Sequence, residues 1–116
     1  MPADVELDRV VPLLREVVRL GVPVSVDTCK PEVMRVALEL GVDIINDIRA
    51  LREPGAMEVV AAHPACGICL MHMHGDPQTM QAAPMKGDVV SVVRDFLVRA
   101  AAQAVSRGVS AARIVL

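Results

Sequence analysis

Three short apolar segments, each ending in polar residues, constrain the fold of this chain more than any other feature. In "PVSVDTCK" the valines at alternate positions lead to Asp27, and in "VDIINDIRA" two isoleucines lead to Asn46 and Asp47. A third segment, "GICLMHMHGD", ends in the same way. Short β-branched runs bounded by turn residues are typical of covered strands. The sequence therefore predicts strands over 22–27, 43–48 and 68–73.

The segments around these strands repeat apolar residues at helical spacing. The expected helices cover 5–20, 31–40, 54–62 and 88–106, and "RIVL" at 113–116 reads as a further strand. Pro31 suits the first position of a helix, and Asp88 is a good N-cap residue. Strands that alternate with helices through short turns are the signature of parallel βα units. Ligands of such folds bind beyond the carboxyl ends of the strands, so Asp27, Asn46 and the residues around His72 are expected to converge on one pocket.

The longest connection is expected over 74–88. Its sequence, "HGDPQTMQAAPMKGD", has too many Gly and Pro residues for regular structure. A loop of this length exceeds most connections in compact domains, and long loops often carry function.

Composition narrows the possible functions. The 116 residues, 53% of them hydrophobic, allow one domain at most, with a modest core. The chain has one Phe and no Trp or Tyr, so it lacks aromatic side chains on which bases could stack. Its net charge of −2 offers no basic surface for a phosphate backbone, so no nucleic-acid partner is expected. No apolar run approaches the length of a membrane span, and the acidic start is unlike a signal peptide, so we expect a soluble, cytoplasmic protein. The three cysteines are expected to be free thiols.

At its strand ends the sequence resembles dihydropteroate synthase. The resemblance is carried by "VSVDTCKPEV", "IINDIRALREPGAM", "CLMHMHGDPQTMQ" and the final "RIVL", in that order and spacing. It implies an α/β fold of parallel βα units, with about four strands and four helices of a (β/α)8 TIM barrel. Such barrels typically need about 250 residues. The chain is therefore expected to be a single segment, 1–116, from the middle of the barrel, between its second helix and its sixth strand.

The resemblance also implies a function. The family is a transferase of folate biosynthesis that joins 6-hydroxymethyl-7,8-dihydropterin diphosphate to p-aminobenzoate and releases pyrophosphate. By resemblance, Asp27 is the catalytic residue that lies against the pterin and stabilises developing positive charge, and Asn46 hydrogen-bonds the pterin ring. Ile48 and Met71 line the faces of the ring. The Mg2+ that the family uses has its Asn ligand outside this chain.

Each candidate also has a plainer interpretation. Asp27 could be a turn or N-cap carboxylate before the second helix, Asn46 a turn residue, and Met71 an ordinary core residue. Strand alternation turns Asp47 away from Asn46, so Asp47 is expected to be structural. The charged face of the first helix, which includes Glu6, is expected to be solvated and without function.

Zinc is a competing possibility. Cys66, Cys69, His72 and His74 form a C-x2-C-x2-H-x-H pattern. In a strand over 68–73, Cys69 and His72 face opposite sides, which is poor geometry for a shared tetrahedral site. We therefore expect no metal site in this chain, and we expect His72 to be packed or hydrogen-bonded at the strand end.

Two other functions remain open. One is a pterin-binding methyltransferase of the related barrel group, against which "CLMHM" and the Pro-Gln-Thr-Met-Gln run favour the synthase. The other is a folding or assembly unit without catalytic competence, because an open array of parallel strands leaves unpaired edges. Two copies would double the strand number, so a homo-oligomer is expected. The isolated chain is expected to have negligible turnover.

Overall fold

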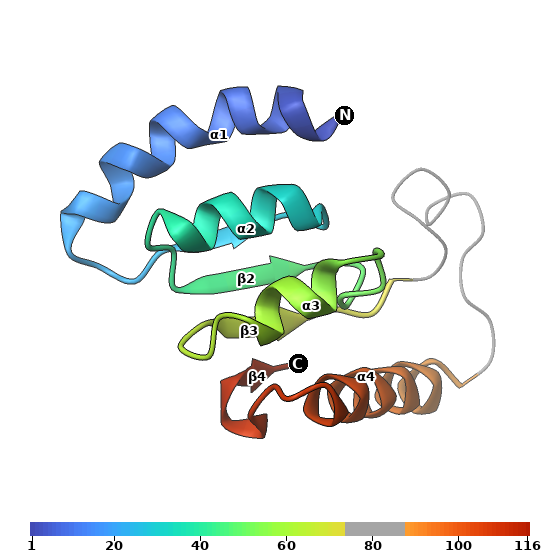
Figure 1. The fold of residues 1–116 in the computed structure, drawn as a ribbon. Helices are drawn as coiled ribbons and strands as arrows, with labels where there is room; N and C mark the ends of the chain where they lie inside the picture. Colours follow the sequence, from blue (N-terminus) through green and yellow to red (C-terminus); the bar gives the residue numbers. More distant parts are fainter. Residues whose placement is uncertain (74–87) are drawn as a thin grey trace.

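The computed structural model describes residues 1–73 and 88–116, in which helices and strands alternate along the chain (Figure 1). The helices are α1 (Ala3–Val17), α2 (Pro31–Glu39), α3 (Ala56–Ala61) and α4 (Val89–Ser106), with 3-10 turns η1 (Val18–Leu20) and η2 (Ala111–Arg113). The strands are β1 (Ser25–Asp27), β2 (Ile44–Asp47), β3 (Gly67–Leu70) and β4 (Ile114–Val115). Except for Asp88, the long loop expected over 74–88 lies outside the described residues.

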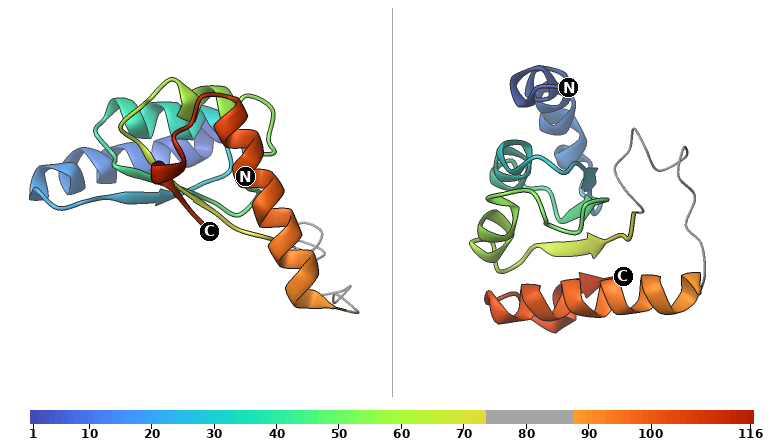
Figure 2. Two further views of the ribbon diagram at one scale, coloured as in Figure 1. Left: turned by 90° about the horizontal axis from the view of Figure 1, so that it is seen from below. Right: turned by 90° about the vertical axis from the view of Figure 1, so that its right-hand side faces the viewer.

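The strands form one parallel sheet whose spatial order, β1-β2-β3-β4, is also their order in the chain. Helices α1, α2 and α3 lie together over one face of this sheet (Figure 2). Sequential parallel strands with helices on the outer face are the repeating arrangement of a (β/α)8 barrel. The expected α/β class of parallel βα units, forming part of such a barrel, is confirmed.

The hydrophobic core lies between the sheet and its helices. Val26, Ile45, Ile68 and Leu70 are buried in it, and every second strand residue between them is more exposed. The described helices cover one face of the sheet (Figure 2). No described helix covers the other face, which we call the open face of the sheet.

The strands are shorter than the apolar runs predicted. Pro23 has no N–H to donate to a ladder, and the amide of Val24 donates to Asp43 Oδ2 at 2.8 Å. β1 therefore begins only at Ser25. The strand expected over 68–73 ends at Leu70, so the residues that follow leave the sheet.

Helix α4 begins as its sequence predicts. Asp88 Oδ1 accepts a hydrogen bond from the amide of Ser91 at 3.1 Å, and its Oδ2 accepts one from Ser91 Oγ at 2.6 Å. These bonds lower the pKa of the Asp88 carboxyl. In the part of the chain that the structure describes, neither α4 nor any other helix is long and apolar enough to cross a membrane.

Candidate functional site

A row of side chains crosses the open face of the sheet. The strand register pairs Asp27 with Asn46, Asn46 with Cys69, and Cys69 with Val115. Neighbouring parallel strands lie about 4.8 Å apart, so residues in register present adjacent side chains. Asp27 is exposed, and Asn46 and Cys69 are half-buried. The carboxylate and the amide that the sequence singled out therefore lie side by side near the carboxyl ends of β1 and β2.

Among the described residues, neither Asp27 nor Asn46 has a structural task that uses its side chain. Lys30 occupies the N-cap position of α2 and no side chain caps that helix, so Asp27 is not its N-cap. Within residues 1–73 and 88–116, neither side chain forms a hydrogen bond with another described residue. No described residue therefore occupies their polar atoms by a side-chain hydrogen bond.

Ile48 and Met71 follow this row at the same edge of the sheet. Ile48 is half-buried in the turn after β2. Met71 comes directly after β3 and is 38% exposed, so it is not an ordinary core residue. These two apolar side chains therefore stand just past Asn46 and Cys69 along their strands.

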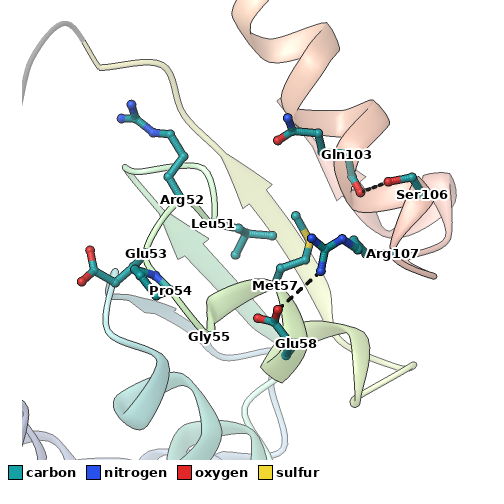
Figure 3. Close-up of a pocket in the computed structure, with 10 residues that line it drawn as sticks. All are labelled: Leu51, Arg52, Glu53, Pro54, Gly55, Met57, Glu58, Gln103, Ser106 and Arg107. Atoms are coloured by element: carbon teal, nitrogen blue, oxygen red, sulfur yellow. Dashed lines mark hydrogen bonds and ion pairs between the residues drawn. The ribbon is translucent and has the colours of Figure 1, made fainter.

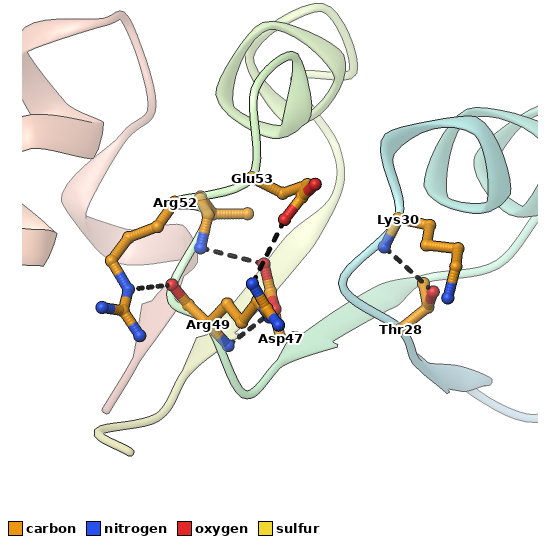
Figure 4. Close-up of polar contacts among 7 residues, drawn as sticks. Thr28, Lys30, Asp47, Arg49, Arg52 and Glu53 are labelled. Atoms are coloured by element: carbon orange, nitrogen blue, oxygen red, sulfur yellow. Dashed lines mark hydrogen bonds and ion pairs between the residues drawn. The ribbon is translucent and has the colours of Figure 1, made fainter. Parts of the chain in front are cut away.

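Asp47 has the structural role that strand alternation predicted. Its side chain is fully buried on the helix-covered face. Oδ1 accepts a hydrogen bond from the amide of Arg49 at 2.8 Å, and Oδ2 accepts one from the amide of Leu51 at 2.9 Å (Figure 4). The turn that these bonds hold contains two left-handed residues, Ala50 at φ 52° and Leu51 at φ 62°. Burial raises the pKa of the Asp47 carboxyl, although both hydrogen bonds oppose the rise.

The residues of the possible zinc pattern have different surroundings. The thiol of Cys66 is buried and donates to the carbonyl of Gly67 at 3.1 Å, and burial raises its pKa. Cys69 lies on the open face, whereas His72 packs edge-to-face on Phe96 of α4 with ring centroids 5.0 Å apart. The packing expected for His72 is confirmed. His74 lies outside the described residues, and the described ones contain no group of three or more His, Cys, Asp or Glu side chains placed to hold a metal ion.

Three cavities lined by described residues lie away from this row. One of 540 Å³ separates the loop before α3 from the end of α4, and its wall includes the ion pair of Glu58 with Arg107 at 3.5 Å (Figure 3). Two others, of 360 and 260 Å³, likewise exclude Asp27 and Asn46. As far as the described residues go, the candidate site is an open surface, and the convergence of its side chains on one pocket stays a prediction.

Behind the row lies a polar network that sequence reasoning missed. Glu6 of α1 is not solvated as expected, because its side chain is only 17% exposed. It accepts a hydrogen bond from Thr28 Oγ1 at 2.7 Å and pairs with Lys30 Nζ at 3.0 Å. A signal was present, since Glu6 precedes the inward-facing Val10 and Leu14 at steps of four residues, the spacing of one helix face.

Comparisons with known proteins identify the family. Sequential parallel βα units define the class as part of an α/β barrel. A profile described as "Pterin binding enzyme" matches residues 1–116, and the chain belongs to this family.

The most similar relatives include dihydropteroate synthases. That of Neisseria meningitidis serogroup B is 46% identical over 112 residues, which are 96% of this chain and 39% of the relative. That of Escherichia coli K12 is 44% identical with the same coverage. The chain thus spans about two fifths of the length of these curated relatives. The resemblance found in the sequence is confirmed.

Solved structures agree with this relationship. Burkholderia cenocepacia dihydropteroate synthase complexed with 7,8-dihydropteroate gives a TM-score of 0.88 at 51% identity, covering 98% of this chain and 41% of that one. The Yersinia pestis enzyme with a sulfonamide drug complex gives 0.93 at 36% identity, covering 98% and 42%. The described fold is therefore the fold of the corresponding part of these enzymes.

Proposed function

We propose that this chain forms the pterin-binding part of a dihydropteroate synthase. In the reaction, the amine of p-aminobenzoate attacks the methylene carbon of 6-hydroxymethyl-7,8-dihydropterin diphosphate. A C–N bond forms, the C–O bond to the diphosphate breaks, pyrophosphate leaves and the amine loses a proton. Support comes from relatives, since the Burkholderia cenocepacia enzyme was solved with 7,8-dihydropteroate and the Xanthomonas albilineans enzyme with 4-aminobenzoic acid.

The pairing of Asp27 with Asn46 on the open face is the observation that carries the proposal. A carboxylate accepts hydrogen bonds from ring N–H groups, and an amide both donates and accepts, so together they suit the polar edge of a pterin. The negative charge of Asp27 also stabilises the positive charge that develops as the diphosphate leaves. Ile48 and Met71 supply apolar surface for the faces of the ring.

Magnesium enters the proposal only as a cofactor of the whole enzyme. The described residues gather no cluster of acidic, His or Cys ligands, and the Asn ligand implied by the resemblance lies outside this chain. The residues present therefore do not fit a magnesium site by themselves. The roles proposed for Asp27 and Asn46 involve only the pterin.

The same proposal extends to compartment and assembly. Cys29, Cys66 and Cys69 are free thiols, as expected, which suits a reducing cytoplasm. Strands β1 and β4 each have only one partner strand among the described residues, and unpaired edges favour pairing with another chain. We therefore propose a cytoplasmic protein that self-associates.

Calorimetric titration tests the function. The folded chain is expected to bind 6-hydroxymethyl-7,8-dihydropterin diphosphate saturably and to release negligible pyrophosphate with both substrates, since it spans only part of its relatives. Methyl transfer from methyltetrahydrofolate would favour the methyltransferase alternative. Absence of pterin binding by a chain shown to be folded would leave a non-catalytic assembly unit.

A further inference from the structure

Helix α1 contacts the segment that immediately follows Asp27. The contact is made by Glu6, whose Oε1 accepts the hydroxyl of Thr28 at 2.7 Å. Glu6 Oε2 pairs with Lys30 Nζ at 3.0 Å. Both partners belong to the loop between β1 and α2, while Glu6 lies 22 residues before Thr28 in the chain. One carboxylate thus joins the first helix to the strand end that carries the candidate catalytic residue.

Thr28 is fixed by its backbone as well as by its side chain. Its amide donates to the carbonyl of Asn46 at 3.1 Å, and its hydroxyl oxygen accepts from the amide of Lys30 at 3.2 Å. The residue is only 5% exposed, so its hydroxyl needs a protein partner. Because Thr28 is bonded covalently to Asp27 and by hydrogen bond to Asn46, it adds to the β1–β2 pairing that places these two residues side by side.

The ion pair makes the carboxylate of Glu6 compatible with its half-buried position. The side chains of Glu6 and Lys30 are 17% and 27% exposed. A carboxylate so placed without a cation would be costly, and the hydrogen bond with Glu6 raises the pKa of Lys30 in agreement with a charged pair. Lys30 therefore holds the Glu6 carboxylate in place to accept the Thr28 hydroxyl (Figure 4 shows Lys30 folded beside Thr28).

Glu6 and Asp27 act on opposite faces of the sheet. Thr28 points with Val26 toward the helix-covered face, where α1 lies, whereas Asp27 is exposed on the open face. Glu6 therefore does not contact a ligand bound beside Asp27, and its contacts with this strand end run through Thr28 and Lys30.

We propose that Glu6 is a positioning residue for the pterin site, which through Thr28 holds Asp27 in register with Asn46. This inference rests on the proposed pterin-binding function. It predicts that removing the Glu6 carboxylate weakens ligand binding without removing any group that touches the ligand.

Amide hydrogen exchange of the unliganded chain tests whether Glu6 holds Thr28 in place. In Glu6→Ala and Thr28→Val the amide of Thr28 is expected to exchange about fivefold faster, the factor that corresponds to the net free energy of one ordinary hydrogen bond. Amides of β3 report general opening and should keep their rates. Glu39→Ala, which removes the carboxylate of the exposed pair between Arg35 and Glu39 at 3.4 Å, is the matched control and should leave the Thr28 amide unchanged.

Pterin titration tests whether the contact between Glu6 and Thr28 affects ligand binding. Glu6→Ala and Thr28→Val are expected to bind the pterin diphosphate roughly tenfold more weakly. This is the lower end of the loss seen when residues that hydrogen-bond metal ligands, without touching the metal, are mutated. Glu6→Gln and Thr28→Ser keep the acceptor and the hydroxyl, so they should bind nearly as tightly as the wild type. This rescue ties the effect to the Glu6 acceptor and the Thr28 hydroxyl, and the exchange rates of the β3 amides report any general loss of stability.

The outcomes separate this inference from the proposed function. Equal pterin affinity in Glu6→Ala and Glu39→Ala would overturn the positioning role. If the wild-type chain binds no pterin, the proposed function fails, and the exchange rate of the Thr28 amide alone decides whether Glu6 holds the Asp27 segment. An unchanged rate in Glu6→Ala would then overturn the inference as well.

Discussion

Replacing Asp47 by Ala tests the structural account of the β2 strand end. The carboxylate is fully buried and accepts two backbone hydrogen bonds, from Arg49 and Leu51. These bonds close a turn in which Ala50 and Leu51 adopt the left-handed conformation, which costs a residue other than glycine about 1–2 kcal/mol. Such a turn persists only where its surroundings hold it. Asp47→Ala removes the two hydrogen bonds that stabilise this turn and is expected to destabilise the fold.

The magnitude follows from the two hydrogen bonds. The bond to Leu51 is buried, so an unsatisfied amide there costs about 1–3 kcal/mol. The bond to Arg49 is only partly buried, so its loss costs about 0.5–1.5 kcal/mol, the net value of an ordinary hydrogen bond. Together these predict a decrease of about 1.5–4.5 kcal/mol in the free energy of unfolding.

The effect depends on pH in a defined direction. Burial raises the pKa of Asp47 in the folded state above its ordinary value of 3.8. Between these two pKa values the folded state binds more protons than the unfolded state, so stability falls as pH rises through this window. The contribution is fully present below 3.8 and is lost above the folded pKa. The stability difference between the wild type and Asp47→Ala should therefore shrink as pH rises through the window.

Urea unfolding followed by circular dichroism measures this difference at a series of pH values from 3.8 upward. Asp43→Ala is a matched control, because Asp43 is exposed and accepts a single backbone hydrogen bond, from Val24. It should cost only about 0.5–1.5 kcal/mol. Equal losses of unfolding free energy in Asp47→Ala and Asp43→Ala would refute the argument from the turn. A stability difference between the wild type and Asp47→Ala that grows with pH would refute the claim that burial outweighs the hydrogen bonds in setting the pKa of Asp47.

Three further predictions concern other parts of the molecule. Arg113→Ala should lower the free energy of unfolding, measured by urea denaturation, by about 2–4 kcal/mol, because the guanidinium donates to three carbonyls at the end of α3 and before β3. Arg113→Lys should not restore stability, because an ammonium group cannot reproduce the planar arrangement of guanidinium donors. Phe96→Ala should cost about 2 kcal/mol in the same assay, since the half-buried ring packs on His72 and lies 5.2 Å from the guanidinium of Arg52. The wild-type chain should self-associate in sedimentation experiments, and a monomer at all concentrations would contradict the proposed oligomer.

Local patterns were sufficient to predict the βα alternation. Pro31 at the start of α2 and Asp88 at the N-cap of α4 act through neighbouring backbone groups, so the sequence alone identifies them. The two-residue period of a strand likewise assigned Asn46 to one face and Asp47 to the other, and the buried hydrogen bonds of Asp47 agree.

What the sequence could not predict depends on contacts between distant segments. The valines and isoleucines of the strands do not reveal that only one sheet face is covered, because this depends on where the helices pack. The partnership of Glu6 with Thr28 joins residues 22 apart, and no local propensity specifies it. The strand end at Leu70 was missed because Met71 and Met73 continue an apolar run that has already left the sheet.

The central claim is that Asp27 and Asn46 form the pterin-binding edge of this chain. Calorimetric titration of 6-hydroxymethyl-7,8-dihydropterin diphosphate, with magnesium present, into the wild type, Asp27→Ala and Asn46→Ala tests it most directly. Glu39→Ala serves as the control, because it removes an exposed carboxylate from α2 and leaves the open face intact. The account predicts saturable binding by the wild type and the control, and loss of binding in both site variants. Wild-type affinity in Asp27→Ala and Asn46→Ala would contradict it.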